Sequence, residues 1–379
     1  MGVKVVNFGC RINWFETALI GQVWGSDASR GNTIVFNTCA VTAEAERQCL
    51  QAVRKARREN PAAQIVITGC ASQINPAFAE LGQVVTNQDK RKFFNIENAL
   101  LSGFADRHRA FVEVQQGCDH GCTYCIVPLV RGRGVSVDPA HIVKQVRGLV
   151  DKGFKEVVVS GIDIASYHGG ISGLVEKILR EVPDLPRLRL SSLDPMGIDD
   201  RLVELFASYP ALMPHLHLSA QSGDDLVLKR MGRRHTYADV LERAMALRRV
   251  RPDLVLGADF ITGFPIETDQ SFENTLDLVR RADIALLHVF PYSVRPQTRA
   301  AKMPQVPVAI RKERAKVLRA LGDEKRLALK RGMVGKRASI LLESGGRGYT
   351  EHYVDVGGLQ GYPENSIIDS ILTERILGI

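Results

Sequence analysis

The chain has 379 residues, of which 45% are apolar and 24% are charged. This composition excludes disordered, collagen-like and coiled-coil proteins, and the length predicts two or three globular domains. The net charge of +8 comes from one segment, residues 302–337, which holds 12 basic and 3 acidic residues, whereas the other residues, 38 basic and 39 acidic, almost cancel. We therefore expect a neutral body with one cationic segment suited to a polyanionic partner.

The seven cysteines argue against a disulfide framework, because their number is odd and Met1 leads directly into the strand-like run Val3–Phe8 rather than into a signal peptide. No apolar stretch approaches the roughly 18 residues that a membrane-spanning helix needs. We expect a soluble cytoplasmic protein with no membrane association.

The first hundred residues alternate short apolar runs, at residues 3–8, 33–36 and 64–67, with a clear helical pattern at residues 43–59. Such alternation is typical of a parallel sheet in an α/β, Rossmann-like domain. Cys10, Cys39 and Cys70 each follow one of the three runs. Parallel sheets bind ligands at this edge, so the three thiols are candidates to converge on one site; the alternative is three buried core cysteines.

From residue 111 to residue 293 the alternation repeats with a longer period. Strands are predicted at residues 111–114, 156–161, 188–193, 215–221, 254–261 and 285–292, with helical patterns between them. Six βα units predict a partial barrel of parallel strands, whose open mouth would accept a large substrate.

The last part of the chain changes character after Pro304 and Pro307. A long charged helix is predicted at residues 308–330, with a narrow apolar stripe of Ile310, Val317, Leu318 and Leu321. Three β-type runs follow, at residues 338–342, 351–356 and 366–372. They predict a small all-β module that packs on the barrel.

The strongest chemical signal is the run from Cys118 to Cys125, in which Cys118, Cys122 and Cys125 have C-x3-C-x2-C spacing directly after the first barrel strand. Three thiolates in a tight loop can hold three irons of a [4Fe–4S] cluster and leave the fourth open for another ligand. The alternative is zinc, although a structural zinc site needs a fourth ligand and His120 is awkwardly placed to supply it.

This cysteine run resembles the signature of the radical S-adenosylmethionine (SAM) enzymes, whose partial (β/α)6 barrel also matches the six predicted units. The resemblance implies that the open iron binds SAM, that reduction of the cluster cleaves SAM to a radical, and that Tyr124 lies beside the adenine of the cofactor.

Further blocks are similar to the methylthiotransferases within that superfamily. Around the first three cysteines stand Gly9-Cys10-Arg11-Ile12-Asn13, Asn37-Thr38-Cys39-Ala40-Val41-Thr42 and Thr68-Gly69-Cys70-Ala71, and the barrel contains His217-Leu218-Ser219-Ala220-Gln221 and Asp259-Phe260-Ile261-Thr262-Gly263-Phe264-Pro265. The resemblance implies a second [4Fe–4S] cluster on Cys10, Cys39 and Cys70. Cys49 fits neither triad and is interpreted as a core residue.

The resemblance predicts three domains: residues 1–104 with the auxiliary cluster, a radical SAM barrel with its basic helix at 105–331, and a TRAM-like β module at 332–379 in the place of the family's small RNA-binding barrel. The first block is most similar to the branch that acts on threonylcarbamoyladenosine next to the tRNA anticodon. The alternatives are isopentenyladenosine in tRNA, an aspartate of a ribosomal protein, or a non-catalytic iron–sulfur protein that binds RNA.

The implied reaction consumes two SAM molecules: one methylates a sulfur on the auxiliary cluster, and the other supplies the radical that activates C2 of the adenine. It requires an external electron donor and a sulfur source. Ser192 and Gln221, near strand ends, are candidates to bind SAM, and Asp163 and Asp194 are weaker ones. Arg233 and Arg234 are expected to contact phosphate or to be solvated.

Two positions depart from the family pattern, because Ile266 and Gln297 stand where glycine is usual. Either change could alter a backbone that needs a positive φ.

Overall fold

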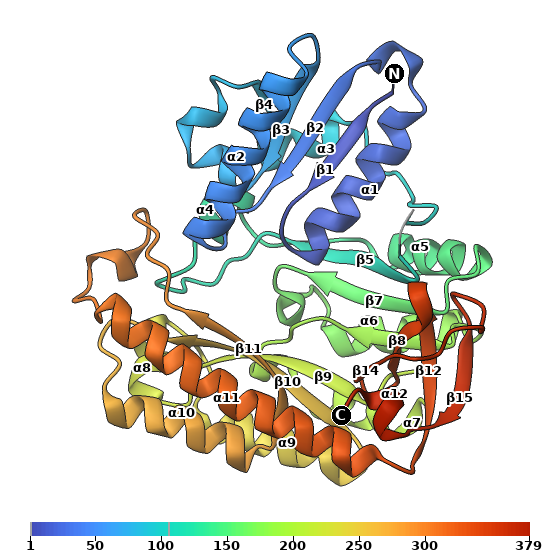
Figure 1. Ribbon diagram of the computed structural model, residues 1–379, viewed down its shortest axis with the longest axis vertical. Coiled ribbons are helices and arrows are strands. Elements are labelled where there is room, and N and C mark those ends of the chain that lie inside the picture. Colours follow the sequence, from blue (N-terminus) through green and yellow to red (C-terminus); the bar gives the residue numbers. More distant parts are fainter. Residues whose placement is uncertain (1, 105–106) are drawn as a thin grey trace.

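The computed structural model describes residues 2–104 and 107–379, so the predicted boundary after residue 104 adjoins residues outside the described part. Figure 1 shows an amino-terminal sheet (blue) above the strands of a curved barrel, with a small carboxyl-terminal sheet (red) beside them. Each of the three predicted units therefore corresponds to a separate set of strands.

The amino-terminal sheet has four parallel strands in the order β1-β2-β3-β4. Its elements are β1 (Lys4–Asn7), α1 (Arg11–Gly25), β2 (Thr33–Thr38), α2 (Ala43–Glu59), β3 (Gln64–Gly69), β4 (Gln83–Val84) and α3 (Asn87–Phe93). The Thr42 side chain caps α2 by accepting from the backbone N–H of Ala45, which explains why this helix begins where the sequence predicts it.

The barrel contains six parallel strands in two hydrogen-bonded sheets, β6-β5-β7-β8 and β11-β10-β9, with β6 as an antiparallel edge strand. Two isolated parallel bridges, Leu188 with Leu212 and Leu193 with Leu218, connect β8 and the residues after it with β9 and the residues before it, which gives a curved, open barrel. The strands are β5 (Arg109–Gln116), β6 (Val135–Ser136), β7 (Glu156–Gly161), β8 (Arg187–Leu190), β9 (His215–Gln221), β10 (Val255–Thr262) and β11 (Ile284–Pro291). The helices are α4 (Val127–Arg131), α5 (Pro139–Asp151), α6 (Ile171–Glu181), α7 (Asp200–Ser208), α8 (Asp225–Met231), α9 (Tyr237–Val250), α10 (Asp269–Arg281) and α11 (Val308–Met333).

The side chains of the barrel strands alternate between an apolar outer layer and a polar interior. Val157, Leu188 and Leu216 point outward into the core that they form with the helices. The opposite register points inward and brings Glu156 within 2.9 Å of Arg189, and His217 within 3.1 Å of Asp259. The interior of the barrel is therefore a polar lumen rather than a second hydrophobic core.

Helix α11 lies across β10 and β11, but it buries a different stripe from the predicted one. Leu318 and Leu321 are buried as expected, whereas Ile310 and Val317 are about 40% exposed. In their place Arg311 and Arg314 are buried: Arg311 donates to the carbonyl oxygens of neighbouring loops, and Arg314 is 2.7 Å from Glu267. Part of the cationic segment thus holds the helix on the barrel instead of facing solvent.

The carboxyl-terminal module is an antiparallel sheet in the order β14-β13-β12-β15. It consists of β12 (Arg337–Glu343), β13 (Arg347–Thr350), β14 (Asp355–Val356), β15 (Ile367–Ile371) and α12 (Glu374–Leu377). Of the predicted strand at residues 351–356, only the last two residues form a strand, β14, and β13 lies before the predicted run. Gly345 and Gly346 both have positive φ and form a tight connection, so the chain pairs with β12 sooner than the sequence pattern indicates.

The module closes the amino-terminal end of the barrel lumen. Arg187 donates to Ser339 at 2.9 Å, and Arg189 donates to the backbone oxygen of Glu351 at 3.2 Å. The ring of Tyr353 lies 4.7 Å from that of His215, and the Tyr353 hydroxyl accepts from Arg11 of the amino-terminal domain at 3.5 Å. The amino-terminal domain, the barrel and the module are therefore joined through partly buried polar contacts.

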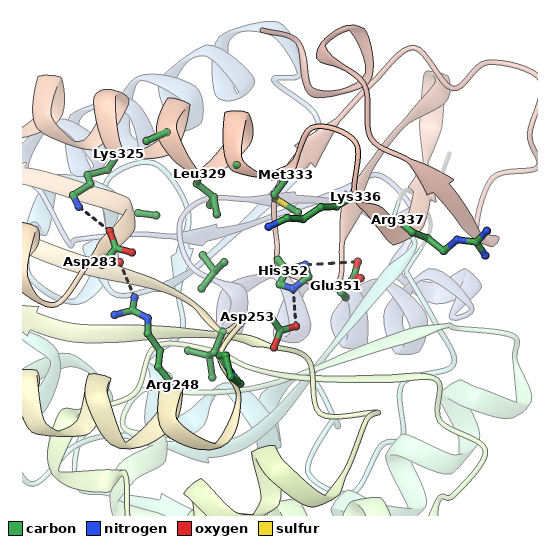
Figure 2. A pocket seen from close by; sticks show the side chains of 16 residues that line it. Arg248, Asp253, Asp283, Lys325, Leu329, Met333, Lys336, Arg337, Glu351 and His352 are labelled. Atoms are coloured by element: carbon green, nitrogen blue, oxygen red, sulfur yellow. Dashed lines mark hydrogen bonds and ion pairs between the residues drawn. The ribbon is translucent and has the colours of Figure 1, made fainter.

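A cavity of about 660 Å³ marks the seam between barrel, α11 and module. Figure 2 shows its charged groups, most of which are paired with one another: Lys325 is 2.7 Å from Asp283, and His352 is 2.9 Å from Asp253. The starts of β10 and β11 line it, so this cavity lies at the opposite end of the strands from the cysteines. We interpret it as part of the structural contact.

One departure from the family pattern has a direct backbone consequence. Ile266 has a φ of +76°, whereas Gln297 is not among the positive-φ residues of the described chain. A side chain with a β-branch in this conformation costs roughly 1–2 kcal/mol. We expect the free energy of unfolding of Ile266→Gly to be about 1 kcal/mol higher than that of Ile266→Ala. This reverses the usual order of stability, in which alanine is favoured over glycine. Urea denaturation of both variants checks this, and equal or lower stability of the glycine variant would contradict the observed backbone.

Within residues 2–104 and 107–379, the structure contains no helix with the length and apolar content needed to cross a bilayer.

Candidate functional site

The first three cysteines converge at the carboxyl edge of the amino-terminal sheet, as the sequence predicts. A Cβ on Gly9, whose φ is +96°, would lie 2.7 Å from Sγ of Cys39, so only glycine allows this sulfur to approach the turn before Cys10. The backbone N–H of Cys70 donates to the oxygen of Thr38 at 2.9 Å, which places Cys70 beside Cys39. Burial, with smaller contributions from Cys10 and Cys70, raises the pKa of Cys39 to about 12.

Cys49 is fully buried, and its sulfur contacts the backbone of Cys39. The N–H of Cys39 donates to Sγ of Cys49 at 3.4 Å, and that sulfur lies 3.8 Å from the oxygen of Cys39. Its prediction as a core residue is confirmed.

The second triad lies in the loop between β5 and α4, at the mouth of the barrel. Backbone N–H groups point at two of its sulfurs, from His120 to Cys118 and from Val127 to Cys125, both at 3.4 Å. Cys118, Cys122 and Cys125 together line a cavity of about 430 Å³. Burial raises the pKa of Cys118 to about 12 and that of Cys125 to about 11, so both are neutral thiols in the metal-free protein at pH 7.

Arg233 follows the end of α8 and supports the cysteine loop. The expectation that it is solvated is therefore wrong. Its guanidinium is 3.7 Å from Sγ of Cys122, 2.7 Å from Asp194 and 2.9 Å from the backbone oxygen of Ser219. Burial alone would raise the pKa of Asp194, but His235 and Arg233 hold it below its ordinary value. Asp194 therefore orients Arg233, while Arg234 is exposed and lies 3.1 Å from His120.

Both triads fit a bound metal cluster by their donor chemistry. Each brings three thiols together, and N–H groups directed at sulfur stabilise thiolates once a metal has displaced the protons. A single metal ion has another donor set here, because ligand atoms of Cys118, His120 and Asp163 all lie within 4.8 Å of one another. In that set, however, Asp163 is already 2.7 Å from His120, and Cys122 and Cys125 would have no role.

The two triads belong to facing elements. The amide of Asn87, on α3, is 3.8 Å from Sγ of Cys70 and donates to the oxygen of Val130, on α4, at 2.8 Å. Helix α4 begins two residues after Cys125, and Cys70 contributes electrostatically to the raised pKa of Cys125. The amide of Asn87 thus links the sulfur of Cys70 to the helix that follows the second triad.

A buried charge network fixes this contact between the domains. Glu16, from α1, is 2.7 Å from Lys90 and 3.1 Å from Arg131, and all three side chains are at most 2% exposed. Arg131 also donates to Asn13 at 2.6 Å, and Asn13 is 3.7 Å from Sγ of Cys10. Burial alone would raise the pKa of Glu16, but Arg131 and Lys90 hold it well below its ordinary value. The network therefore connects the Cys10 loop to the segment after Cys125.

A further cavity, of about 290 Å³, opens between the domains. It is lined by Val41 and Thr42, which follow Cys39, and by Tyr124, Cys125 and Gln221 from the barrel mouth. Gln221 has a φ of +67° at the end of β9, a strained conformation of the kind found at binding sites. Tyr124 and Gln221, two predicted cofactor residues, thus share one cavity.

The third predicted cofactor residue is placed differently. Ser192 is half-buried and is not in the lining of that cavity, whereas the hydroxyl of its neighbour Ser191 is buried and has no hydrogen-bond partner in the described part of the chain. Asp163 lies 3.9 Å from Sγ of Cys118, so it belongs to the cysteine loop.

Sequence reasoning assigned no role to the residues that join the domains, namely Asn13, Glu16, Asn87, Lys90 and Arg131. They come from three separate helices, α1, α3 and α4, and no local spacing marks them as partners. The burial of Asn87 and Lys90 on α3 would have been a signal, but burial is not visible without the fold.

The fold and the three-cysteine loop at the barrel mouth define a radical SAM enzyme. The Radical SAM superfamily model matches residues 112–279, and the model described as Uncharacterized protein family UPF0004 matches residues 2–89. A solved radical SAM methyltransferase, TsrM from Kitasatospora setae, aligns with a TM-score of 0.62 at 13% identity, covering 79% of this chain and 76% of that one. This likeness concerns the fold alone.

Curated relatives narrow the class. The chain is 43% identical to the threonylcarbamoyladenosine tRNA methylthiotransferase MtaB of Rickettsia prowazekii, over 93% of this chain and 90% of the relative, and 33% identical to that of Thermotoga maritima, over 99% and 92%. It is 31% identical to the tRNA-2-methylthio-N(6)-dimethylallyladenosine synthase of Ehrlichia canis, over 90% and 88%. The chain belongs to the methylthiotransferase family of radical SAM enzymes, a superfamily that uses SAM and a [4Fe–4S] cluster.

Proposed function

We propose that this enzyme converts N6-threonylcarbamoyladenosine at tRNA position 37 to its 2-methylthio derivative, with one [4Fe–4S] cluster on Cys118, Cys122 and Cys125 and a second on Cys10, Cys39 and Cys70. The observation that carries the proposal is the proximity of the two triads across one seam, where Asn87 bridges Cys70 and the helix that follows Cys125, because a methylthio transfer requires the sulfur donor and the activated carbon in one place. The higher identity to the MtaB relatives favours this substrate over isopentenyladenosine.

Bound at the second triad, a cluster with SAM supplies the one-electron chemistry that breaks a C–H bond which no side-chain base is strong enough to ionise. The protein holds the reactants. Cys118, Cys122 and Cys125 are the cluster ligands, and Arg233 fixes the loop through Cys122. Tyr124 and Gln221 are positioned to bind SAM in the cavity between the domains, and Ser192 remains a further candidate.

The same cavity offers apolar surface for a nucleobase. Val41 is 61% and Phe290 is 41% exposed on its wall, which leaves apolar surface that a base could contact. An aromatic ring at a cavity mouth is the common platform on which an extruded base stacks. Thr42 and Arg295, from the two domains, complete the lining, so the base would lie between the triads and out of water.

The tRNA backbone would contact the cations of the basic segment that are not engaged in the fold. Lys312, Lys316, Arg331, Lys336 and Arg337 are exposed, whereas Arg311 and Arg314 hold α11 in place. Such contacts release counterions and make binding dependent on salt. The reaction also needs an external electron donor and a source of sulfur.

Mass spectrometry of tRNA nucleosides tests the proposal. In a strain that lacks this gene, 2-methylthio-N6-threonylcarbamoyladenosine should disappear and its unmethylthiolated precursor should accumulate, while 2-methylthio-isopentenyladenosine stays unchanged. Expression of the wild-type chain should restore the lost nucleoside. Loss of the isopentenyl derivative instead would assign the enzyme to the other branch, and loss of neither would contradict a tRNA substrate.

A further inference from the structure

The loop that carries the second triad is bordered by three other parts of the chain. Thr123, in the middle of the loop, donates through Oγ1 to the backbone oxygen of Arg230 at 2.8 Å, and its own oxygen accepts from the N–H of Ala300 at 2.8 Å. The N–H of Cys118 donates to the oxygen of Gly132 at 3.1 Å. The end of α8, the residues around 300 and the residues after α4 therefore meet at this loop.

These bordering segments are strongly cationic. Residues 118–134, 228–234 and 297–302 contain eight arginines and lysines and a single carboxylate, Asp119. Two of the cations, Arg131 and Arg233, are engaged in the contacts described above. The other six are exposed: Arg133, Lys229, Arg230, Arg234, Arg299 and Lys302. Within residues 2–104 and 107–379, the only ion pair that these six form is that of Arg133 with Asp119, at 3.2 Å.

The exposed cations adjoin the cavity that all three cysteines of the loop line. Arg133 and Arg299 belong to its lining, and so does Leu129, which is 59% exposed. The lining contains no Phe, Tyr or Trp in the part of the chain that the structure describes. This cavity shares only Cys125 with the cavity between the domains. A partner that covers the cationic surface would therefore leave the nucleobase cavity open.

The cationic surface is also close to the sulfur atoms. The guanidinium of Arg234 lies 3.1 Å from the ring of His120, and the backbone N–H of His120 is 3.4 Å from Sγ of Cys118. Arg299 donates to the backbone oxygen of Gly121, which precedes Cys122. One residue therefore separates these cations from the triad, so a partner seated on them would be near a bound cluster.

The chemistry at the second triad requires a partner of this kind. Reductive cleavage of SAM consumes one electron, which an external donor must bring to the cluster. The donor loses one electron and the cluster gains it, and no bond forms or breaks in this step. Electron-transfer proteins form small, weak complexes whose association is steered by opposite charge. Cations combined with an exposed leucine fit an acidic protein, whereas an RNA surface would favour an aromatic platform for the bases.

We propose that the six exposed cations and Leu129 form the docking surface for a small acidic electron-carrier protein, from which the electron enters the cluster at the second triad. This inference rests on the part of the proposed function that assigns a cluster to Cys118, Cys122 and Cys125. It does not depend on which tRNA nucleoside is modified.

The test uses a flavodoxin, a small acidic protein whose reduced flavin donates one electron, as the probe. Arg230→Glu/Lys302→Glu reverses two exposed cations of the docking surface. Arg54→Glu/Arg58→Glu is the matched control, because it changes the net charge equally on the exposed side of α2. We expect the Kd of the metal-free enzyme for oxidised flavodoxin to rise at least ~10-fold in the first variant and to stay unchanged in the control. The rate at which reduced flavodoxin loses its electron to the reconstituted enzyme should fall by a similar factor.

A second donor and a second variant separate docking from catalysis. Dithionite is a small reductant that needs no docking surface, so with dithionite the charge-reversed variant should form 5′-deoxyadenosine as fast as the wild type. The affinity of the wild type for flavodoxin should fall as NaCl is added, because salt screens exposed charges. Leu129→Ser should weaken binding without changing this salt dependence, because it removes apolar surface and no charge.

Several results would overturn the inference. Absence of flavodoxin binding by the wild type, or unchanged affinity and electron-transfer rate in both surface variants, would remove the docking surface. Loss of dithionite-driven SAM cleavage at full iron content would assign the two cations to the cofactor site. Weaker tRNA binding with unchanged flavodoxin affinity would make the surface an RNA contact. Electron transfer is measured without tRNA, so a wild-type enzyme that accepts the electron but modifies neither tRNA would contradict the proposed function alone.

Discussion

Replacing Cys118 by alanine should abolish both SAM cleavage and methylthio transfer, whereas replacing Cys10 by alanine should abolish transfer and leave SAM cleavage measurable. The physical reason is the separation of the triads: Cys118 belongs to the barrel loop that shares a cavity with Cys122 and Cys125, and Cys10 belongs to the edge of the amino-terminal sheet. Each cluster needs all three of its thiolates, so one substitution should empty one site only.

Anaerobic reconstitution, followed by assays for 5′-deoxyadenosine and for the methylthiolated nucleoside, checks both expectations. Each variant should retain about half of the iron of the wild type. Cys49→Ala is the matched control, because Cys49 is buried beside Cys39 and has no place in either triad. It should keep all of the iron at a stability cost of about 1 kcal/mol. If Cys10→Ala loses SAM cleavage while its remaining iron is intact, the two triads do not have separate roles.

The second large effect is expected from Glu16→Gln, which leaves two buried cations without their carboxylate. Lys90 and Arg131 lie 2.7 Å and 3.1 Å from Glu16 in a region that water does not reach. Removing one partner of a buried pair costs about 3–5 kcal/mol, because the remaining charges stay desolvated. The exposed pair of Lys55 and Glu59, 4.0 Å apart, offers the matched control, and Glu59→Gln should cost less than about 0.5 kcal/mol.

Urea denaturation of the metal-free protein measures this effect. Tryptophan fluorescence reports the unfolding of the helix that carries Glu16. The two tryptophans, Trp14 and Trp24, both lie on α1, which also carries Glu16.

The pH dependence has a definite sign. Because the folded pKa of Glu16 is depressed, its contribution is present above the unfolded value of about 4.3 and is lost as the pH falls toward the folded pKa. Glu16→Gln should lack that part of the acid destabilisation; an unchanged acid profile would show that Glu16 is not ionised in the folded protein.

The barrel and the amino-terminal sheet were predictable because their strands carry a complete local signal. An apolar run such as residues 156–161 sits between clear helical patterns, and β7 occupies those same residues. The carboxyl-terminal module was less predictable. Gly348 lies inside β13, where a Cβ would be 2.3 Å from the backbone oxygen of Leu341, so close pairing rather than strand propensity places it. The pattern of residue types along the chain does not reveal such close pairing between strands.

The candidate site was predictable in its cysteines and not in its supporting groups. Strand ends brought Cys10, Cys39 and Cys70 together, since parallel strands share one edge. The burial of Arg314 depends on Glu267, which lies far away in the chain, and the role of Arg131 depends on a helix of another domain. The alternation along β9 does place His215 and His217 on one face, but it does not say that this face is a polar lumen.

The contacts of Arg187 and Arg189 bear on how far the enzyme can be divided. Both guanidinium groups are about 98% buried or more, and the carboxyl-terminal module supplies them with hydroxyl and backbone acceptors. Removal of the module would leave the two arginines in an open lumen. It would also remove Tyr353, whose ring lies against that of His215. The module thus completes the interior of the barrel. A role in RNA binding could not be gained or lost by adding or removing the module as an independent domain.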